Sequence, residues 1–286
     1  MPKRIRGLEE IASRYSAILC DVWGVLHNGQ SRYPEAEQAL TSYRAQGGRV
    51  VLITNSPRRN QGVAEQLATL GFGADAFDAI VTSGDVTRTL IKEAQGGVFH
   101  LGPSRDLPLF EGLDVVFSDE ANCQTVVCTG LIDDETETPD HYRSMLSGFA
   151  KRGVSFVCAN PDLIVERGNR LIYCAGSLAK SYEEMGGKVL VAGKPHAPIY
   201  RLARQRLEEV AGGDVAQRDI IAVGDGMPTD VAGAINNGLD LLYISGGIHS
   251  AEYGDTANPD EPALNEFLMR HNAGNAVWMP CLEWGS

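Results

Sequence analysis

The sequence predicts an α/β fold in which a largely parallel sheet is interrupted by a second α/β segment. Short apolar runs rich in β-branched residues alternate with stretches of helical period, as in parallel strands joined by crossover helices. At 286 residues the chain is longer than one domain usually is. Two glycine pairs, Gly96-Gly97 and Gly186-Gly187, bracket a segment with its own strand and helix patterns. Together these observations predict two α/β parts.

Start and stop signals separate the predicted strands from the predicted helices. Pro34 begins one helix, which Gly47-Gly48 end, and Pro57 begins another, which ends before Gly71. These signals agree with the spacing of the apolar residues. The predicted strands are Ala17–Cys20, Val50–Ile53, Ala79–Thr82, Val98–Leu101, Val126–Cys128, Ser155–Ala159, Val189–Ala192, Ile220–Val223, Leu241–Ile244 and Ala276–Met279.

Two local patterns have more than one interpretation. The paired glycines at 96–97 and 186–187 are candidate hinges for an inserted domain, but they can equally be helix stops. The acidic run Asp133–Glu137 resembles a calcium loop only superficially. Thr138 as a helix N-cap, Pro139 as the first helical residue and a solvated, charged approach to them explain the run better.

Composition excludes several classes of function. The 25 Lys and Arg against 37 Asp and Glu give a net charge of -12, which disfavours binding to nucleic acid or to an anionic membrane. The six cysteines form no CxxC pair, so buried, reduced thiols in a reducing compartment are the simplest interpretation. No apolar run approaches the roughly 20 residues of a membrane span, and no signal peptide is evident. We therefore expect a cytoplasmic protein.

Polar residues of a consistent kind follow four of the predicted strands. They are Asp21, the triplet Thr54-Asn55-Ser56, Lys194, and the pair Asp225 and Asp230. In an open parallel sheet the carboxyl ends of the strands line one crevice. We therefore expect these residues to share one site, although each of them alone is weak evidence.

Together these groups suit one reaction. Asp21 and Asp225 are ionised at neutral pH and repel each other unless a cation lies between them. Mg²⁺ fits, because it prefers oxygen ligands and bridges to substrate phosphates. Asp21 can attack phosphorus to form an aspartyl phosphate that water hydrolyses. Thr54 and the amides after it can donate to the phosphoryl oxygens, and Lys194 offsets the negative charge.

The same residues resemble the motifs of the haloacid dehalogenase-like superfamily. The matching segments are Asp21-Val-Trp-Gly-Val-Leu, Leu52-Ile-Thr-Asn-Ser, Thr82-Ser-Gly, Cys158-Ala-Asn-Pro-Asp162, Gly193-Lys-Pro and Val223-Gly-Asp-Gly-Met-Pro-Thr-Asp. The resemblance is closest to class IIA, the phosphatases of sugar phosphates, phosphoglycolate, pyridoxal phosphate and 4-nitrophenyl phosphate. It implies a Rossmann-like catalytic core of residues 1–97 and 186–286, and an inserted class II cap of residues 98–185 that helps to select the substrate.

The resemblance also implies a role for each motif residue. Asp21 would be the nucleophile, and Lys194 would bridge to the phosphoryl group. Thr54 and Asn55 would hold that group, and Ser56, which follows them, is a further candidate for binding the substrate. The implied Mg²⁺ ligands are Asp21, the backbone carbonyl of Trp23, Asp225, and Asp230, the last through water or as a support of the site.

One departure from the family pattern affects the chemistry. Phosphatases of this type carry a second Asp two residues after the nucleophile, as general acid and base, and here Trp23 occupies that position. Indole cannot do this, and loss of such catalysis costs about 10²- to 10⁴-fold. His27 is the nearest titratable replacement, or else a loop histidine making one hydrogen bond. Alternatively, the substrate needs little acid assistance, as with acyl phosphates, phosphonates or halides, or the chain only binds phosphometabolites.

We therefore predict a Mg²⁺-dependent hydrolase of small phosphorylated metabolites, with sugar phosphates among the candidates. Phosphonatase or dehalogenase activity, and non-catalytic binding, remain the alternatives. Asn160, Asp162 and the loop through Arg170 are candidate substrate contacts, although a β-turn at Asn-Pro-Asp explains them equally well. Because caps of this kind can dimerise, a homodimer is a further expectation.

Overall fold

The apolar runs form parallel strands in the computed structural model, which describes residues 1–168 and 170–285. Contacts divide the chain into two units. The first comprises Met1–Thr54, Ala64–Val81 and the described chain from Lys194 onward, and the second comprises Asn55–Val63 and Thr82–Gly193. The predicted boundaries of core and cap, at residues 97/98 and 185/186, stay a prediction.

A sheet of seven strands, in the order β1-β13-β12-β11-β2-β3-β4, forms the centre of the first unit. The pairs from β1 through to β3 are parallel. All four residues of β2 are buried, as expected for a central parallel strand covered on both faces. The strands are β1 Lys3–Arg4, β2 Ala17–Cys20, β3 Arg49–Thr54, β4 Ala79–Thr82, β11 Ile220–Gly224, β12 Asp240–Ile244 and β13 Val277–Met279.

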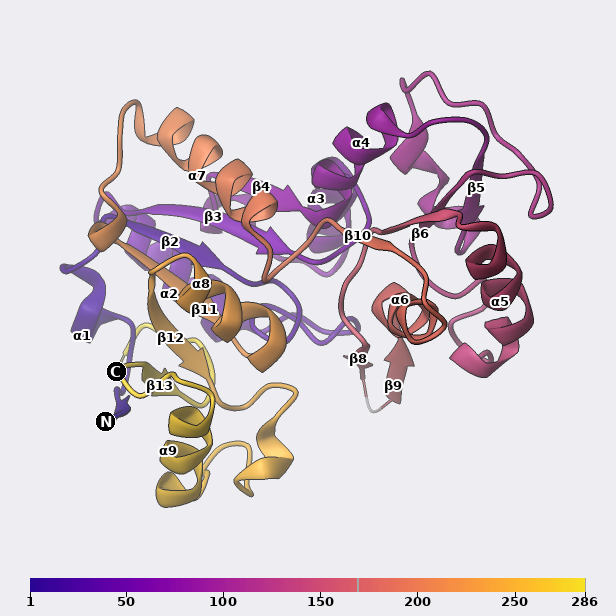
Figure 1. Cartoon of the computed structure of the whole chain (residues 1–286). Helices are drawn as coiled ribbons and strands as arrows, with labels where there is room; N and C mark the ends of the chain where they lie inside the picture. The colour runs from indigo at the N-terminus through magenta and orange to yellow at the C-terminus, as the bar shows by residue number, and fades with distance from the viewer. Residues whose placement is uncertain (169, 286) are drawn as a thin grey trace. The chain divides into compact units, whose positions relative to one another are not determined.

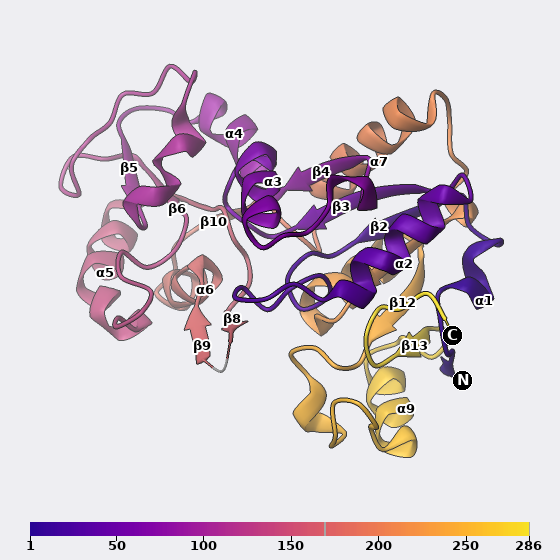
Figure 2. The ribbon, with the colours of Figure 1, turned by 180° about the vertical axis from the view of Figure 1, so that it is seen from behind.

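Helices cover both faces of this sheet. Helices α7 and α8 lie on one face (Figure 1), and α2 lies on the other (Figure 2). Pro34 is the first residue of α2, as the sequence predicts. The next helix begins at Asn60 rather than at Pro57, because Ser56 accepts from the backbone N–H of Arg58 and keeps the segment in a turn. The helices are α1 Glu9–Ala12, α2 Pro34–Ala45, α3 Asn60–Thr69, α7 Ala197–Ala211, α8 Ala232–Asn236 and α9 Glu261–Arg270.

A second, four-stranded parallel sheet, in the order β10-β7-β6-β5, forms the centre of the second unit. An antiparallel hairpin, β8-β9, accompanies it. The strands are β5 Val98–Leu101, β6 Thr125–Cys128, β7 Ser155–Cys158, β8 Ile164–Arg167, β9 Arg170–Tyr173 and β10 Val189–Val191, and the helices are α4 Ser83–Glu93, α5 Arg143–Arg152 and α6 Ala175–Glu184. Short helical turns complete both units: η1 Ala74–Ala76, η2 Ser104–Phe110, η3 Pro139–Tyr142, η4 Gln217–Asp219, η6 Ser250–Glu252 and the π-helix η5 Met227–Val231.

The side chains of β6 alternate between two buried clusters, one on each face of this second sheet. Val126 and Cys128 pack in one buried cluster with Phe149 of α5 and Tyr182 of α6. Val127, between them, faces the other way and belongs to a separate cluster that includes residues of α4. Side chains alternate between the faces of a strand, so helices cover this sheet on both faces as well.

The structure contains every strand that the sequence predicts, with ends that agree to within one residue. It adds β1 and the hairpin β8-β9, which the sequence did not reveal. Leu171 in the hairpin is 63% exposed, so the periodic burial that marks a strand is weak there. Gly186, with φ 84°, follows the end of α6, which favours the helix-stop interpretation of that glycine pair.

All six cysteines are free thiols, and only Cys281 is exposed. Among the described residues, no helix combines the length and the apolar character needed to cross a lipid bilayer.

Candidate active site

Two adjacent strands bring Asp21 and Asp225 together. Strands β2 and β11 are parallel neighbours, with Cys20 opposite Val223. The backbone N–H of Asp21 continues this pairing and donates to the Val223 carbonyl at 2.8 Å. Each Asp follows the last residues of its strand, so both carboxylates lie at the same edge of the sheet. Residues separated by most of the chain thus become neighbours.

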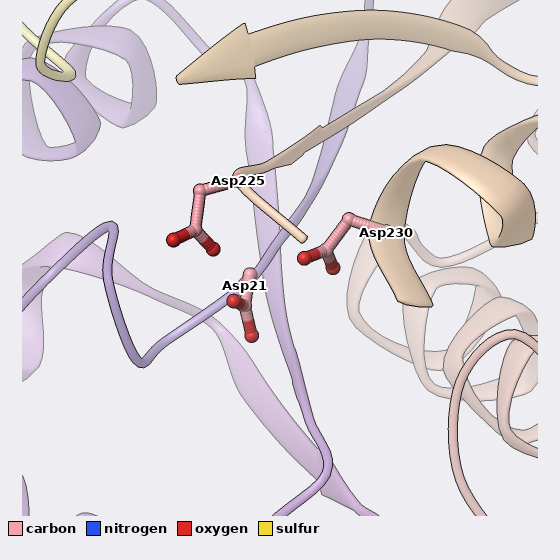
Figure 3. Close-up of side chains that lie close together, drawn as sticks. All are labelled: Asp21, Asp225 and Asp230. Carbon is pink, nitrogen blue, oxygen red and sulfur yellow. The ribbon is translucent and has the colours of Figure 1, made fainter. Parts of the chain in front are cut away.

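Asp230 completes a cluster of three buried carboxylates. It lies in the π-helix η5, directly after β11, and its side chain points toward Asp21 and Asp225 (Figure 3). One carboxylate oxygen from each of the three lies within 4.8 Å of those from the others. All three residues are buried.

Lys194 supplies the cation that the sequence predicts for this site. Its Nζ donates to Asp21 Oδ1 at 2.6 Å and to Asp230 Oδ1 at 2.7 Å, and the residue is only 2% exposed. One ammonium group does not neutralise three carboxylates. Buried carboxylates without sufficient countercharge are costly. A divalent cation bound between them would offset the remaining negative charge.

Burial of Asp21 has a clear effect on its acidity. Desolvation, and next the neighbouring carboxylate of Asp230, raise the pKa of Asp21 well above its usual value, although Lys194 acts in the opposite direction. A bound cation would favour the ionised form. The donor set therefore fits Mg²⁺, which prefers carboxylate oxygens and water.

Two glycines and two backbone N–H groups hold the late carboxylates in place. A Cβ on Gly24, where φ is 86°, would lie 2.4 Å from Asp225 Oδ2, and one on Gly247 would lie 2.0 Å from the same atom. The backbone N–H of Ile248 donates to this oxygen at 2.9 Å. That of Gly226 donates to Asp230 Oδ2 at 3.0 Å. The carboxylates therefore have defined positions.

The loop that provides Gly247 and Ile248 was missed in the sequence. It follows β12, and its His249 accepts from the backbone N–H of Met227 at the start of η5. A signal was present, because Ser245-Gly246-Gly247 follows a predicted strand just as the other motifs do. Backbone N–H donors are expected after Thr54 for the same reason, and the argument extends to this loop.

The three residues of the Thr54-Asn55-Ser56 triplet have different surroundings. Thr54 is the last residue of β3 and is buried. Strand β3 pairs with β2, with Cys20 opposite Leu52, so Thr54 ends its strand at the same edge of the sheet as Asp21. Asn55 Nδ2 donates to Asp162 Oδ1 at 2.8 Å, and Ser56 Oγ accepts from a local backbone N–H.

Trp23 and His27 lie in the loop after β2 and contact each other. Their rings meet edge to face with centroids 4.9 Å apart. His27 is only 1% exposed, and burial lowers its pKa to about 4. Its Nδ1 accepts from the backbone N–H of Gly29 at 2.9 Å. His27 is therefore neutral at pH 7, and these features favour a loop histidine with one hydrogen bond over an acid-base catalyst.

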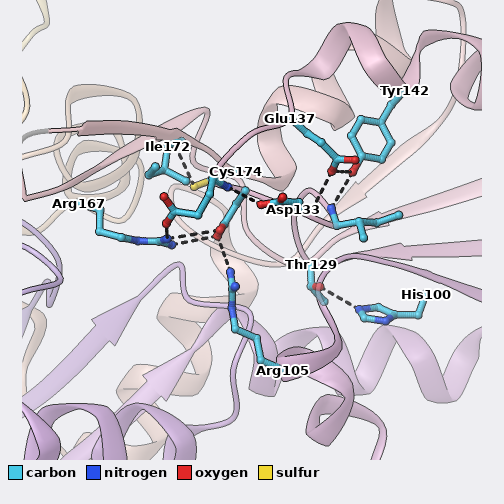
Figure 4. A network of polar contacts seen from close by, with 12 residues as sticks. His100, Arg105, Thr129, Asp133, Glu137, Tyr142, Arg167, Ile172 and Cys174 are labelled. Carbon is cyan, nitrogen blue, oxygen red and sulfur yellow. Dashed lines mark hydrogen bonds and ion pairs between the residues drawn. The ribbon is translucent and has the colours of Figure 1, made fainter.

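A second polar network lies in the second unit and involves the acidic run Asp133–Glu137 (Figure 4). The Asp134 side chain is 10% exposed and makes ion pairs with Arg105 and Arg167. Glu135 pairs with Arg167 and Arg170, so the run fastens the β8-β9 hairpin. Thr138 is the N-cap of η3, as predicted. The predicted solvated approach is wrong for Asp134, because arginines from distant segments surround it.

Comparison with known proteins agrees with this site. A family model described as haloacid dehalogenase-like hydrolase matches residues 18–116, and one described as HAD-hydrolase-like matches residues 191–267. A hydrolase of the haloacid dehalogenase-like family from Brucella suis 1330 is 46% identical, with a TM-score of 0.87, over 99% of this chain and 100% of that one. The chain belongs to the haloacid dehalogenase-like hydrolase family. The predicted family, with its class IIA phosphatases, and the predicted fold of core and inserted cap are thereby confirmed.

More distant relatives of this hydrolase have named activities. An acid sugar phosphatase of Staphylococcus saprophyticus is 27% identical over 242 residues, which are 83% of this chain and 89% of that protein. The structure of a glycerol phosphate phosphatase from Mycobacterium tuberculosis, in complex with magnesium, is 25% identical with a TM-score of 0.64. That match covers 83% of this chain and 70% of the other. Both of these relatives are phosphatases.

Proposed function

We propose that this hydrolase is a Mg²⁺-dependent phosphatase of small phosphorylated metabolites that forms an aspartyl phosphate on Asp21. The observation that carries the proposal is the buried cluster of Asp21, Asp225 and Asp230 with Lys194. A protein that only binds phosphometabolites has no need for a carboxylate placed to attack. A dehalogenase has no need for two further carboxylates.

Mg²⁺ would be held by Asp21, Asp225 and the Trp23 backbone carbonyl, with Asp230 binding through water or supporting the site. When bound, the ion would offset the charge of the phosphoryl oxygens and of the carboxylates. Three buried carboxylates lie close together with the Lys194 ammonium in the described part of the chain, and this excess of negative charge supports the assignment. The predicted cytoplasmic location and homodimer also stay proposals, the first consistent with the free thiols.

The residues of the chain divide the reaction between them. An oxygen of Asp21 attacks phosphorus, and the bond from phosphorus to the leaving oxygen breaks with its electron pair on that oxygen. Lys194 holds the attacking carboxylate by a 2.6 Å hydrogen bond and offsets phosphoryl charge. Thr54 and the N–H groups that follow it donate to the phosphoryl oxygens. Water then attacks the aspartyl phosphate, releasing phosphate and restoring Asp21.

Trp23 restricts the substrates that react well. Its indole cannot protonate a departing oxygen, and His27 is neutral and held by Gly29. Leaving groups that are stable as anions, such as aryl or acyl oxyanions, need no such proton. We therefore expect sugar phosphates with alkyl leaving groups to react more slowly than aryl or acyl phosphates.

The test is hydrolysis of 4-nitrophenyl phosphate by the purified protein with Mg²⁺ and with a chelator. We expect turnover that requires Mg²⁺ and that falls by about 10³-fold or more in Asp21→Asn, which keeps the side-chain shape but removes the nucleophile. Asp219→Asn, a partly exposed carboxylate of the same unit, is the matched control. Turnover that persists in chelator, or that is restricted to phosphonates or haloacids, would contradict the proposal. Phosphate binding without turnover would identify a non-catalytic relative.

A further inference from the structure

One hydrogen bond in the second unit joins two of the motifs that the sequence singled out. Asn55, directly after the phosphoryl-binding candidate Thr54, donates from Nδ2 to Asp162 Oδ1 at 2.8 Å. A carboxylate accepts hydrogen bonds and cannot donate them when ionised, so it selects the nitrogen side of the Asn55 amide. The Asn55 side chain therefore bridges to another segment of the second unit.

The Asn-Pro-Asp segment is built to hold that carboxylate. The Asn160 side chain accepts from the backbone N–H of Asp162 at 3.1 Å, which closes a turn. The Cys158 thiol donates to the Asn160 carbonyl at 3.3 Å, and Asn160 is 9% exposed. This side-chain bond makes an Asx turn, and the β-turn that the sequence offered as an alternative stays a prediction. The effect of the Asx turn is to fix the direction of Asp162.

Two glycines let this turn approach its neighbours closely. A Cβ on Gly176 would lie 2.2 Å from the Pro161 carbonyl oxygen. One on Gly193 would lie 2.3 Å from Asn55 Oδ1 and 2.8 Å from Pro161. A side chain at either position would push the turn or the Asn55 amide away. The Asn55 amide therefore lies between Gly193, which directly precedes Lys194, and the Asn-Pro-Asp segment.

We propose that Asp162 is a positioning residue that acts on the phosphoryl-binding segment through the Asn55 side chain. This rests on the proposed function, in which the segment after Thr54 binds the phosphoryl group. By fixing the Asn55 amide, Asp162 fixes the backbone N–H groups of residues 55 and 56 against rotation. Asp162 does not select the leaving group in this arrangement. Its effect on binding is the same for every phosphate compound.

The experiment is a double-mutant cycle of Asp162→Ala and Asn55→Ala, read out as affinity for inorganic phosphate in Mg²⁺ by calorimetry and as kcat/KM for 4-nitrophenyl phosphate. We expect Asp162→Ala to weaken phosphate binding about tenfold in the wild-type background. In the Asn55→Ala background the same change should have an effect of about twofold or less. Asp162→Asn can still accept from Asn55 through its amide oxygen and should lose less. Asp140→Ala, an exposed carboxylate of the same unit, is the control for charge and should leave both quantities unchanged.

An equal effect of Asp162→Ala in both backgrounds would overturn the proposal, as would a loss for the ester without a loss for phosphate, because that result indicates direct contact with the leaving group. The side-chain amide signals of Asn55 in NMR spectra give a readout that does not need turnover. They should shift in Asp162→Ala and not in Asp140→Ala, and unchanged signals would also overturn it. If the wild type binds phosphate but hydrolyses nothing, the proposed function fails, and the binding cycle and the amide signals still decide the role of Asp162.

Discussion

Gly247→Ala is the sharpest test of how the carboxylate cluster is held. The added methyl carbon would lie 2.0 Å from Asp225 Oδ2, whereas ordinary van der Waals contact begins at 3.4 Å. The two groups must therefore separate by about 1.4 Å. A movement of this size would break or stretch the hydrogen bond from the Ile248 N–H to the same oxygen. Gly247 is not one of the glycines with a positive φ. An alanine can therefore adopt its backbone conformation, and backbone strain does not add to the cost of the substitution.

The expected cost has two parts. Overpacking of this kind destabilises a protein by about 1–3 kcal/mol. Displacement of a catalytic group by about 1 Å can cost 10²-fold in rate. We therefore expect a higher Mg²⁺ concentration for half-maximal activity and about 10²-fold lower kcat/KM on 4-nitrophenyl phosphate, together with a lower free energy of unfolding in urea.

Gly274→Ala is the matched control, because it lies in the same unit and its Cβ would meet only the Met269 side chain, at 3.8 Å. It should change neither Mg²⁺ activation nor kcat/KM. If Gly247→Ala has the same Mg²⁺ dependence as the control variant, then close packing against Gly247 does not hold the Asp225 carboxylate in position.

Three further predictions concern side chains. With Mg²⁺, an aryl phosphate should be hydrolysed about 10²-fold or more faster than an alkyl phosphate, and Trp23→Asp should raise the alkyl rate; equal initial rates, or a slower variant, would reject this account of Trp23. Since burial lowers the pKa of His27 to about 4, His27→Ala should leave the pH dependence of kcat/KM unchanged between pH 5 and 9, measured about one unit apart; loss of an inflection there would assign His27 a catalytic role. Burial acts to raise the pKa of Asp134, but hydrogen bonds from Arg167 and Arg105 outweigh it and hold the folded-state pKa below 3.8. The ionised Asp134 carboxylate therefore stabilises the fold at neutral pH. This stabilisation is lost as the pH falls through the folded-state pKa. Asp134→Asn should cost about 1–2 kcal/mol in urea unfolding at pH 7, and the difference from wild type should shrink below about pH 4; a constant difference would contradict this.

The sequence predicted the strands well because each one is a buried apolar run with a marked end. The placement of Asp21 and Asp225 at one edge followed from the general rule for parallel sheets, and the structure brings them together with Asp230 and Lys194. The roles assigned to these residues stay predictions. The site could be predicted from sequence because Asp21 and Asp225 follow strands directly, and Lys194 and Asp230 come a few residues after strands.

Other features were not accessible, and the reasons are physical. The β8-β9 hairpin buries little, so Leu171 and its neighbours show no clear period. The contribution of Ile248 is a backbone N–H, which every residue except proline carries, so only the place of Ser245-Gly246-Gly247 after a strand indicates it. The bond from Asn55 to Asp162 joins positions far apart in the chain, and nothing in either motif indicates the partner. Tertiary pairing of this kind cannot be read from local pattern.

The pairing of β2 with β11 has a consequence for the order of synthesis. Strands β2, β3 and β4 leave the ribosome early, and β2 then presents an unpaired apolar edge until residues 220–224 have been made. Such an edge invites pairing with other chains. When β11 arrives it closes this edge and delivers Asp225 beside Asp21 in the same step. A nascent chain interrupted before this point would lack both the proposed catalytic centre and its protection against aggregation.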